Sequence, residues 1–214
     1  MSDYGPSLTP RMRPINPKRS TIVSVLDVGT SKVVCLIAEL LPVSGAEALK
    51  GRTHKARIIG LGHQRARGIK GGAIIDLEAA EHSIRLAIDS AERMARVEVR
   101  SVIVNMTGGR LKSEAFTAEV SLRGQGVSDG DIRRVFEAMS FTGAETGRSV
   151  LHSLPTGFAI DETRHIRDPH GMIGERLGVD MHILTSDEYA IRNLMLAVER
   201  CHVGVEAVVA SPYA

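Results

Sequence analysis

The hydrophobic and polar positions in the first half of the chain predict three strands, one helix and a further strand. Thr21 to Val28 and Lys32 to Leu41 are rich in aliphatic residues and are separated by only a tight turn. Lys55 to Gln64 has the composition of a third strand. An apolar stripe at helical spacing follows over Asp76 to Arg96, which begins with a good N-cap residue. Ser101 to Met106 then has the pattern of a buried strand.

The pattern changes after this strand, and the elements become shorter and more irregular. They are, in order, an irregular strand over Leu111 to Leu122, a helix opened by the capping box Ser128 to Asp131, a strand over Val150 to Ile160 interrupted at Pro155, a polar loop over Arg164 to Gly178 and a strand over Gly178 to Thr185. A second capping box, Thr185 to Glu188, opens a helix that we expect to end near Gly204. Val205 to Ala210 then resumes a buried strand.

This order of elements predicts an α/β protein with an inserted subdomain. Strand-strand-strand-helix-strand is the opening of an RNase-H-like, actin-type subdomain, and strand-helix-strand-strand is a small α+β insert within it. We predict four segments: a flexible, proline-rich basic tail over 1–20, the actin-like subdomain over 21–100, the insert over 101–184 and the second part of the actin-like subdomain over 185–214. Because a core strand runs almost into Ala214, we also expect the domain to be truncated.

Composition narrows the function classes. The formal net charge of +2 is too small to indicate nucleic-acid binding, and 3% aromatic residues argue against a stacking surface. No apolar run approaches a membrane span and no signal-peptide pattern is present, so we expect a cytoplasmic protein. Cys35 and Cys201 lie in apolar segments and are expected to be buried free thiols, and no metal site of recognised spacing occurs.

The turn between the first two strands carries the residue types of a phosphate clamp. Gly29 lets the backbone approach a ligand, and the N–H groups of the turn can form an anion-binding nest. Thr30 and Ser31 add hydroxyl donors, Lys32 adds a point charge, and Asp27 can hold a hydrated magnesium ion. The turn therefore predicts phosphate binding in the hairpin form of the actin-like ATPases. The chain contains no Walker motif.

Three other interpretations of these residues stay open. Asp and Gly are common in ordinary hairpins, so the turn alone also fits a structural role. A sugar-kinase-like phosphotransferase begins with a similar clamp, but only Asp161 and Asp187 could serve as its general base, and neither lies in a recognisable pocket motif. The chain could also be an interaction module with a vestigial clamp, in which the helix from Ile132 to Met139 contacts a neighbouring subunit.

Several segments carry a resemblance when they are taken together. They are the clamp Leu26 to Val33, the stretch Arg67 to Gly72 leading into Asp76-Leu77-Glu78, the stretch Val150 to His152 continuing through Pro155 to Phe158-Ala159-Ile160-Asp161, and Ala197 to Cys201. In this order they resemble the FtsA family of bacterial cell-division proteins, over roughly Ser20 to Ala214. The resemblance implies an actin-like ATPase fold in which one actin subdomain is replaced by an insert, here near Ser101 to Thr185.

The resemblance also implies a function. FtsA-like proteins bind ATP, polymerise into membrane-attached filaments, tether the FtsZ ring and recruit later septal proteins, partly through the insert. In this chain Gly29, Thr30 and Ser31 would hold the terminal phosphates, Lys32 would neutralise their charge, and Asp27 would hold magnesium through water. We expect the full-length protein to have at most weak ATPase activity and to lie on the inner face of the cell membrane at the division site. A pilus-assembly actin homologue is an alternative within the superfamily.

The chain departs from the family pattern because the features of the second half do not follow. A second phosphate motif, D-x-G-G-G-T, is missing, as are the adenosine-binding segment, the amphipathic membrane helix and the region that docks FtsZ. The ending from Ala210 to Ala214 resembles the start of the connecting helix at the nucleotide cleft. We therefore expect an amino-terminal half without the second actin-like half. Such a chain should bind ATP weakly or not at all, because a cleft needs both walls.

Overall fold

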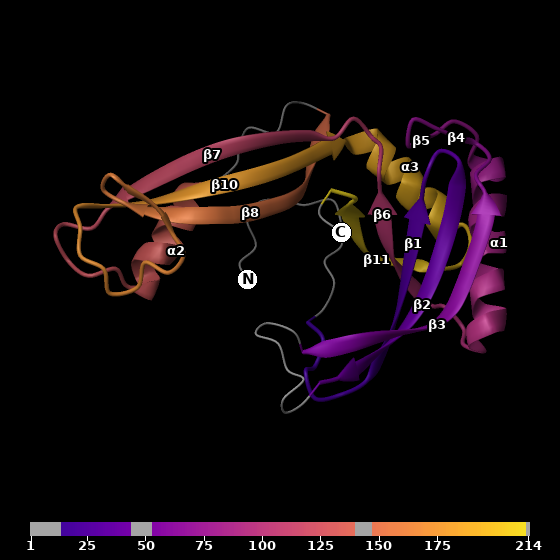
Figure 1. Cartoon of the computed structure of the whole chain (residues 1–214). Coiled ribbons are helices and arrows are strands. Elements are labelled where there is room, and N and C mark those ends of the chain that lie inside the picture. Colours follow the sequence, from indigo (N-terminus) through magenta and orange to yellow (C-terminus); the bar gives the residue numbers. More distant parts are fainter. Residues whose placement is uncertain (1–13, 44–52, 140–146, 213–214) are drawn as a thin grey trace. The chain divides into compact units, whose positions relative to one another are not determined.

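A computed structural model describes residues 14–43, 53–139 and 147–212 of the chain (Figure 1). The described residues divide into two compact units. One is the insert, residues 111–187, and the other is made of the residues before and after it. Most of the predicted basic tail, residues 1–13, lies outside the described residues. No described helix has both the length and the apolar character needed to cross a bilayer.

The first unit is built on a five-stranded sheet with the strand order β11-β6-β1-β2-β3. The strands are β1 (Thr21–Val28), β2 (Lys32–Pro42), β3 (His54–Arg65), β6 (Ser101–Met106) and β11 (Gly204–Ala210). β1 and β2 form an antiparallel hairpin, β3 is antiparallel to β2, and β6 is parallel to both β1 and β11. The carboxyl ends of β1, β3, β6 and β11 therefore meet at one edge of the sheet (Figure 1).

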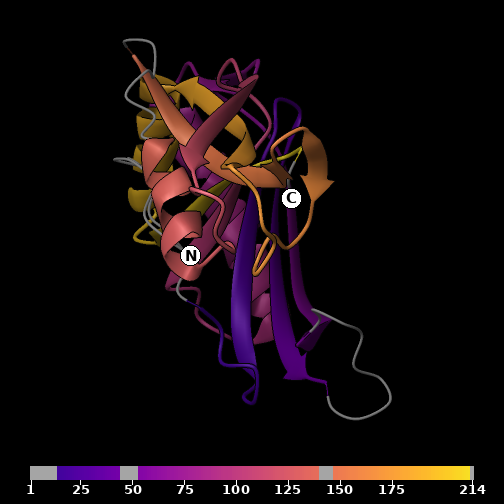
Figure 2. The same cartoon turned by 90° about the vertical axis from the view of Figure 1, so that its left-hand side faces the viewer.

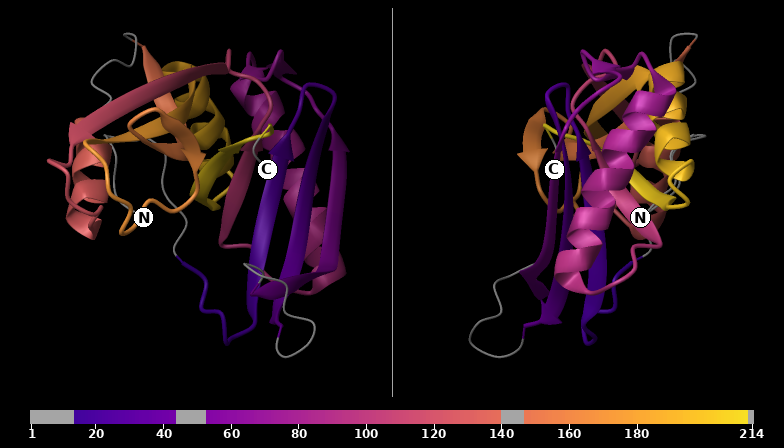
Figure 3. Two further views of the ribbon diagram at one scale, coloured as in Figure 1. Left: turned by 60° about the vertical axis from the view of Figure 1, so that its left-hand side comes forward. Right: turned by 90° about the vertical axis from the view of Figure 1, so that its right-hand side faces the viewer.

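Helices α1 (Leu77–Ala95) and α3 (Glu188–Glu199) cover one face of this sheet (Figure 3). Alternate residues of β1, such as Leu26, are buried on this side, and the residues between them are half-buried or exposed. α1 starts at the predicted N-cap, Asp76, whose Oδ1 atom accepts from the N–H of Ala79 at 3.1 Å. The helix lies very close to β3, because a Cβ atom on Gly62 would be 1.8 Å from the carbonyl oxygen of Ala87. Glycine is thus required there.

The glycine-rich connection after β3 forms a small hairpin of β4 (Ile69–Lys70) and β5 (Ala73–Ile74). Its turn lies against the chain that leaves β6. A Cβ atom on Gly72 would be only 2.2 Å from the Cα atom of Gly108. Gly72 also has a positive φ of 72°, so it needs glycine for both reasons. This contact places a second loop at the same edge of the sheet as the β1–β2 turn.

The described residues of the insert form a four-stranded antiparallel sheet and one helix. Its strand order is β7-β10-β8-β9. The elements are β7 (Lys112–Ser121), α2 (Asp129–Ala138), β8 (Arg148–Ile160), β9 (Thr163–Ile166) and β10 (Arg176–Asp187). α2 packs on one face of the sheet, where Val135 joins a buried cluster with Leu177, Val179 and Met181 of β10 (Figures 1 and 2). The predicted capping box is present, since the Ser128 and Asp131 side chains each bond the other's backbone N–H.

Two strands differ from the sequence predictions. The strand Ser101–Met106 pairs with β1 and β11, so the insert starts after residue 110 instead of at 101. β8 runs through Pro155 without a break, although its register shifts beside it. Proline is tolerated there because β9 pairs with β8 only at Phe158 and Ile160, so that no described strand pairs with Pro155 on that side.

Further differences concern residues predicted as loop or cap. Thr163–Ile166 forms the edge strand β9, which overlaps the start of the polar loop predicted over Arg164 to Gly178. The prediction of a second capping box over Thr185 to Glu188 is wrong, because β10 continues through Asp187 and α3 begins directly after it. α3 ends at Glu199, earlier than expected. Both cysteines are free thiols, but Cys201 is only half-buried.

Candidate phosphate site

The predicted clamp lies at the edge where the strand ends meet. Asp27 is the second-last residue of β1 and pairs with Val34 on one side and Asn105 on the other. The N–H of Gly29 donates to the carbonyl of Lys32 at 3.0 Å, which closes the hairpin and leaves Thr30 and Ser31 exposed at its tip. The structure therefore places the five predicted residues at the turn end of the β1–β2 hairpin.

The backbone geometry corrects one part of the predicted nest. Because the Gly29 N–H is used inside the hairpin, the nest is reduced to the N–H groups of Thr30 and Ser31. These two groups donate to no described residue. Gly29 keeps the turn narrow, since a Cβ atom there would lie 3.1 Å from the Lys32 carbonyl oxygen. The tip is held in place by the N–H of Ala66, which donates to the Ser31 carbonyl at 3.1 Å.

Sequence reasoning missed a polar network beside the clamp. The Nδ2 atom of Asn105 donates to Oδ1 of Asp27 at 2.8 Å, and the Oγ atom of Ser211 donates to Oδ1 of Asn105 at 3.0 Å. The Ser211 hydroxyl also lies 2.9 Å from Oγ1 of Thr107. The available signal was that polar residues occur near the ends of three apolar strands. Their meeting follows only from parallel pairing in this register.

The charges at the site suit an anion with a hydrated cation. The side chain of Lys32 is exposed, and its ammonium group makes no hydrogen bond or ion pair with a described residue. Among the described residues, no group of three or more His, Cys, Asp or Glu could bind a metal directly. Asp27 is thus a single carboxylate, which fits magnesium held through water and phosphate oxygens. Cys35 takes no part, because burial and the charge of Glu92 raise its pKa to about 12.

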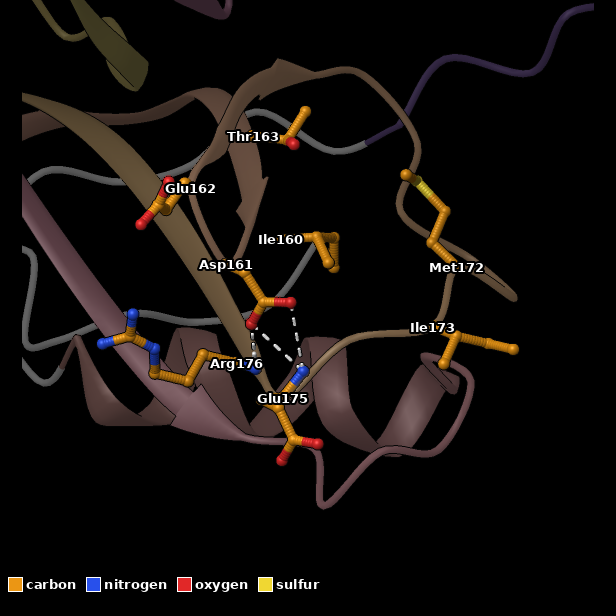
Figure 4. A pocket seen from close by; sticks show the side chains of 8 residues that line it. All are labelled: Ile160, Asp161, Glu162, Thr163, Met172, Ile173, Glu175 and Arg176. Atoms are coloured by element: carbon orange, nitrogen blue, oxygen red, sulfur yellow. Dashed lines mark hydrogen bonds between the residues drawn. The ribbon is translucent and has the colours of Figure 1, made fainter.

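The aspartates considered as general bases lie elsewhere. Asp161 is in the insert, beside a cavity of about 570 Å³ lined by residues 160–163, 172–173 and 175–176 (Figure 4). Its carboxylate accepts from the N–H groups of Glu175 and Arg176 at 2.9 to 3.3 Å, as the dashed lines in Figure 4 show. These bonds close a loop of the insert. Asp187 ends β10, opposite Arg148 in β8. Neither residue belongs to the clamp's unit.

Comparison with known proteins assigns the family. The family model for the SHS2 domain inserted in FtsA matches residues 108–185, close to the bounds of the insert. Cell division protein FtsA of Agrobacterium fabrum is 52% identical over 216 residues, which cover 100% of this chain and 49% of that protein. FtsA of Rhizobium meliloti is 51% identical over 205 residues, covering 96% of this chain and 46% of that protein. The chain belongs to the FtsA family. The predicted resemblance is confirmed.

The FtsA relatives also set the scope of this assignment, because the chain spans about half of their length. Among solved structures, the fold is similar to a protein described as the PilM-PilN type IV pilus biogenesis complex. The TM-score is 0.53 at 11% sequence identity, and the match covers 89% of this chain and 47% of that one. This likeness concerns the fold alone. Together with the FtsA insert, it confirms the predicted actin-like α/β fold.

Proposed function

We propose that this chain provides the ATP-phosphate-binding part of an FtsA-type cell-division protein. The observation that carries the proposal is the hairpin tip beside Asp27, where two N–H groups, two hydroxyls and one ammonium group lie together without partners among the described residues. A terminal phosphate is bound by several donors of this kind, and magnesium prefers oxygen ligands such as a carboxylate. Membership of the FtsA family supports a role in cell division.

Each clamp residue has a distinct role in this proposal. The N–H and hydroxyl groups of Thr30 and Ser31 would bind the terminal phosphate oxygens, and Lys32 would neutralise their charge. Gly29 shapes the turn, as its N–H is already used. Asp27 would hold magnesium through water, and the bound ion would shield the phosphate charge. The chain's own contribution is therefore to bind and orient the phosphates.

The proposal extends to the assembly in which the complete protein acts. We propose that it polymerises into filaments, links the FtsZ ring to the inner face of the cytoplasmic membrane and recruits later septal proteins through the insert. We assign the contacts with FtsZ and the membrane to the part of FtsA proteins that this chain does not span. Co-sedimentation of the chimera described below with FtsZ polymers tests this part. A chimera that stays in the supernatant would contradict it.

ATP binding can be tested with a chimera that joins this chain to the second half of the Agrobacterium fabrum protein. Gly29→Asp should abolish MgATP binding in isothermal titration, because a carboxylate at the tip repels the phosphates. Gly29→Ala is the matched control: its Cβ also meets the Lys32 carbonyl but adds no charge, so it should weaken binding only modestly. Equal affinity in wild type and Gly29→Asp would overturn the assignment. For the chain alone we expect weak or no binding, because it spans about half the length of its FtsA relatives and a nucleotide cleft needs two walls.

A further inference from the structure

A chain of hydrogen bonds runs from the clamp to the end of β11. Asn105 lies opposite Asp27 in the parallel pairing of β1 and β6, and its Nδ2 atom donates to Asp27 Oδ1 at 2.8 Å. Ser211 donates to Asn105 Oδ1 at 3.0 Å, and Thr107 lies 2.9 Å from the Ser211 hydroxyl. Four side chains from three parallel strands and their ends are thus linked in series.

Chemistry fixes the direction of this series. An ionised carboxylate can only accept hydrogen bonds, so the Asn105 amide must present its nitrogen to Asp27. Its oxygen then faces Ser211, which must donate to it. The Ser211 hydroxyl has only one proton, so it accepts the proton of Thr107. If the Asn105 amide turned over, its oxygen would face the carboxylate, which costs the hydrogen bond and adds repulsion.

The position of Ser211 is set by the sheet. Its N–H donates to the carbonyl of Met106 at 3.0 Å, which continues the pairing of β11 with β6 by one residue. The hydroxyl that orients Asn105 is therefore placed by backbone hydrogen bonds. No buried side-chain nitrogen or oxygen in the described part of the chain lacks a partner. Asp27 Oδ2, which receives no hydrogen bond from a described residue, is thus not fully buried.

We propose that Asn105 is a positioning residue for Asp27 and that Ser211 fixes the orientation of its amide. This inference rests on the proposed binding of MgATP. Asn105 holds Oδ1 so that Oδ2 stays available for the water shell of magnesium, as an outer-shell residue does in other metal sites. Because coupling between sites is reciprocal, magnesium bound at Asp27 also tightens the hydrogen bonds at Ser211, the residue that follows β11.

The test uses the chimera and compares ATP affinity in magnesium with ATP affinity in EDTA. Asn105→Leu keeps the approximate volume but removes both hydrogen bonds, and it should raise the Kd of MgATP by about 10- to 100-fold. The Kd of metal-free ATP should change much less. Ser211→Ala keeps Asn105 but removes the hydrogen bond that orients its amide. It should therefore also raise the Kd of MgATP, but by a smaller factor. Asn193→Leu, an exposed residue of α3, is the matched control and should change neither Kd.

A second measurement follows the Ser211 N–H resonance by NMR. In wild type, MgATP should shift this resonance, and ATP in EDTA should shift it less; in Asn105→Leu the two responses should be equal. If wild type binds no MgATP, the proposed function fails and this inference fails with it. If wild type binds MgATP but Asn105→Leu and Ser211→Ala keep its affinity and its magnesium dependence, only this inference is overturned. If Asn105→Leu does not fold, Ser211→Ala decides.

Discussion

The two units of the molecule use their polar residues differently. In the five-stranded sheet, Asp27, Asn105 and Ser211 are far apart in the chain but meet because three parallel strands end together. In the insert, antiparallel strands and tight loops bring mainly nearer neighbours together. Asp161 closes a loop by accepting from the N–H groups of Glu175 and Arg176.

The comparison shows where ligand chemistry can take place. Two polar residues of the insert have their side-chain groups occupied: both oxygens of Asp161 accept backbone N–H groups, and both ring nitrogens of His170 contact carboxylates. At the parallel edge, the donors of Thr30 and Ser31 have no partner among the described residues. These two residues of the insert thus stabilise its own loops, whereas the turn of the five-stranded sheet keeps donors available for a ligand.

The largest expected effect comes from breaking the five-stranded unit at Gly62. In Gly62→Ala the new Cβ would lie 1.8 Å from the Ala87 carbonyl oxygen, so α1 has to move away from β3. We expect a loss of about 3 kcal/mol in the free energy of unfolding of this unit, at the upper end of overpacking costs. The rate of alkylation of Cys35 measures this loss of stability, because the thiol is fully buried in the same sheet and reacts only when the unit opens.

Gly130→Ala is the matched control in the insert. A Cβ atom there would be 3.5 Å from the Ser128 Oγ atom, which is an ordinary contact. Alanine also favours helix over glycine. This variant should leave the alkylation rate of Cys35 unchanged. If Gly62→Ala alkylates at the wild-type rate, the close packing of α1 on β3 is wrong.

A smaller effect is expected at the start of α2 in the insert. Ser128 and Asp131 satisfy each other's backbone N–H groups. The Ser128 hydroxyl and the Ser128 N–H both donate to the Asp131 carboxylate, which lowers the pKa of Asp131. Ser128→Ala should destabilise the helix by about 1 kcal/mol, the usual cost of losing an N-cap. Hydrogen exchange of the α2 amides measures this destabilisation. Hydrogen exchange of the α1 amides should not change. Ser128→Asp, which can still cap the helix, should restore most of the protection.

Much of the fold could be predicted because its signals are local. The cap at Asp76, the stripe of α1 and the hairpin around Gly29 depend on neighbours within a few residues. The capping box at Ser128 was found for the same reason. The second capping box failed because Thr185 has the right residue type but continues a strand. The local sequence pattern alone does not distinguish a residue that caps a helix from one that continues a strand.

The rest depends on pairing that the sequence does not state. Asn105 and Ser211 become part of the site only through the parallel register of β1, β6 and β11. The strand Ser101–Met106 was assigned to the insert because nothing in its own pattern says which sheet it joins. Thr163–Ile166 was missed because three exposed polar residues of an edge strand show no apolar alternation. These errors share one cause, which is the lack of information about non-local contacts.

The smallest expected effect is a pH dependence of one loop in the insert. His170 Nδ1 lies 2.5 Å from Asp168 Oδ1, and Nε2 lies 2.8 Å from Asp129 Oδ1 at the start of α2. Hydrogen bonds to these two carboxylates raise the pKa of His170 above its ordinary value of 6.5, and the bond to His170 lowers the pKa of Asp168 below 3.8. Both ring nitrogens can donate only when the imidazole is protonated.

The sign of this dependence follows from the two shifts. The contribution of His170 to the stability of this loop is fully present below pH 6.5 and is lost as pH rises through the raised pKa of His170. The contribution of Asp168 to the same stability is present above pH 3.8 and is lost as pH falls through the lowered pKa of Asp168. The loop should therefore be most stable between these two pH values.

Hydrogen exchange of the Gly171 amide, whose N–H donates to the Val127 carbonyl at 2.9 Å, measures the stability of the loop. After correction for intrinsic rates, protection should be lower at pH 8 than at pH 5.5. His170→Gln should remove this difference and His202→Gln, in the other unit, should keep it; a difference that survives in His170→Gln would show that another group holds the loop.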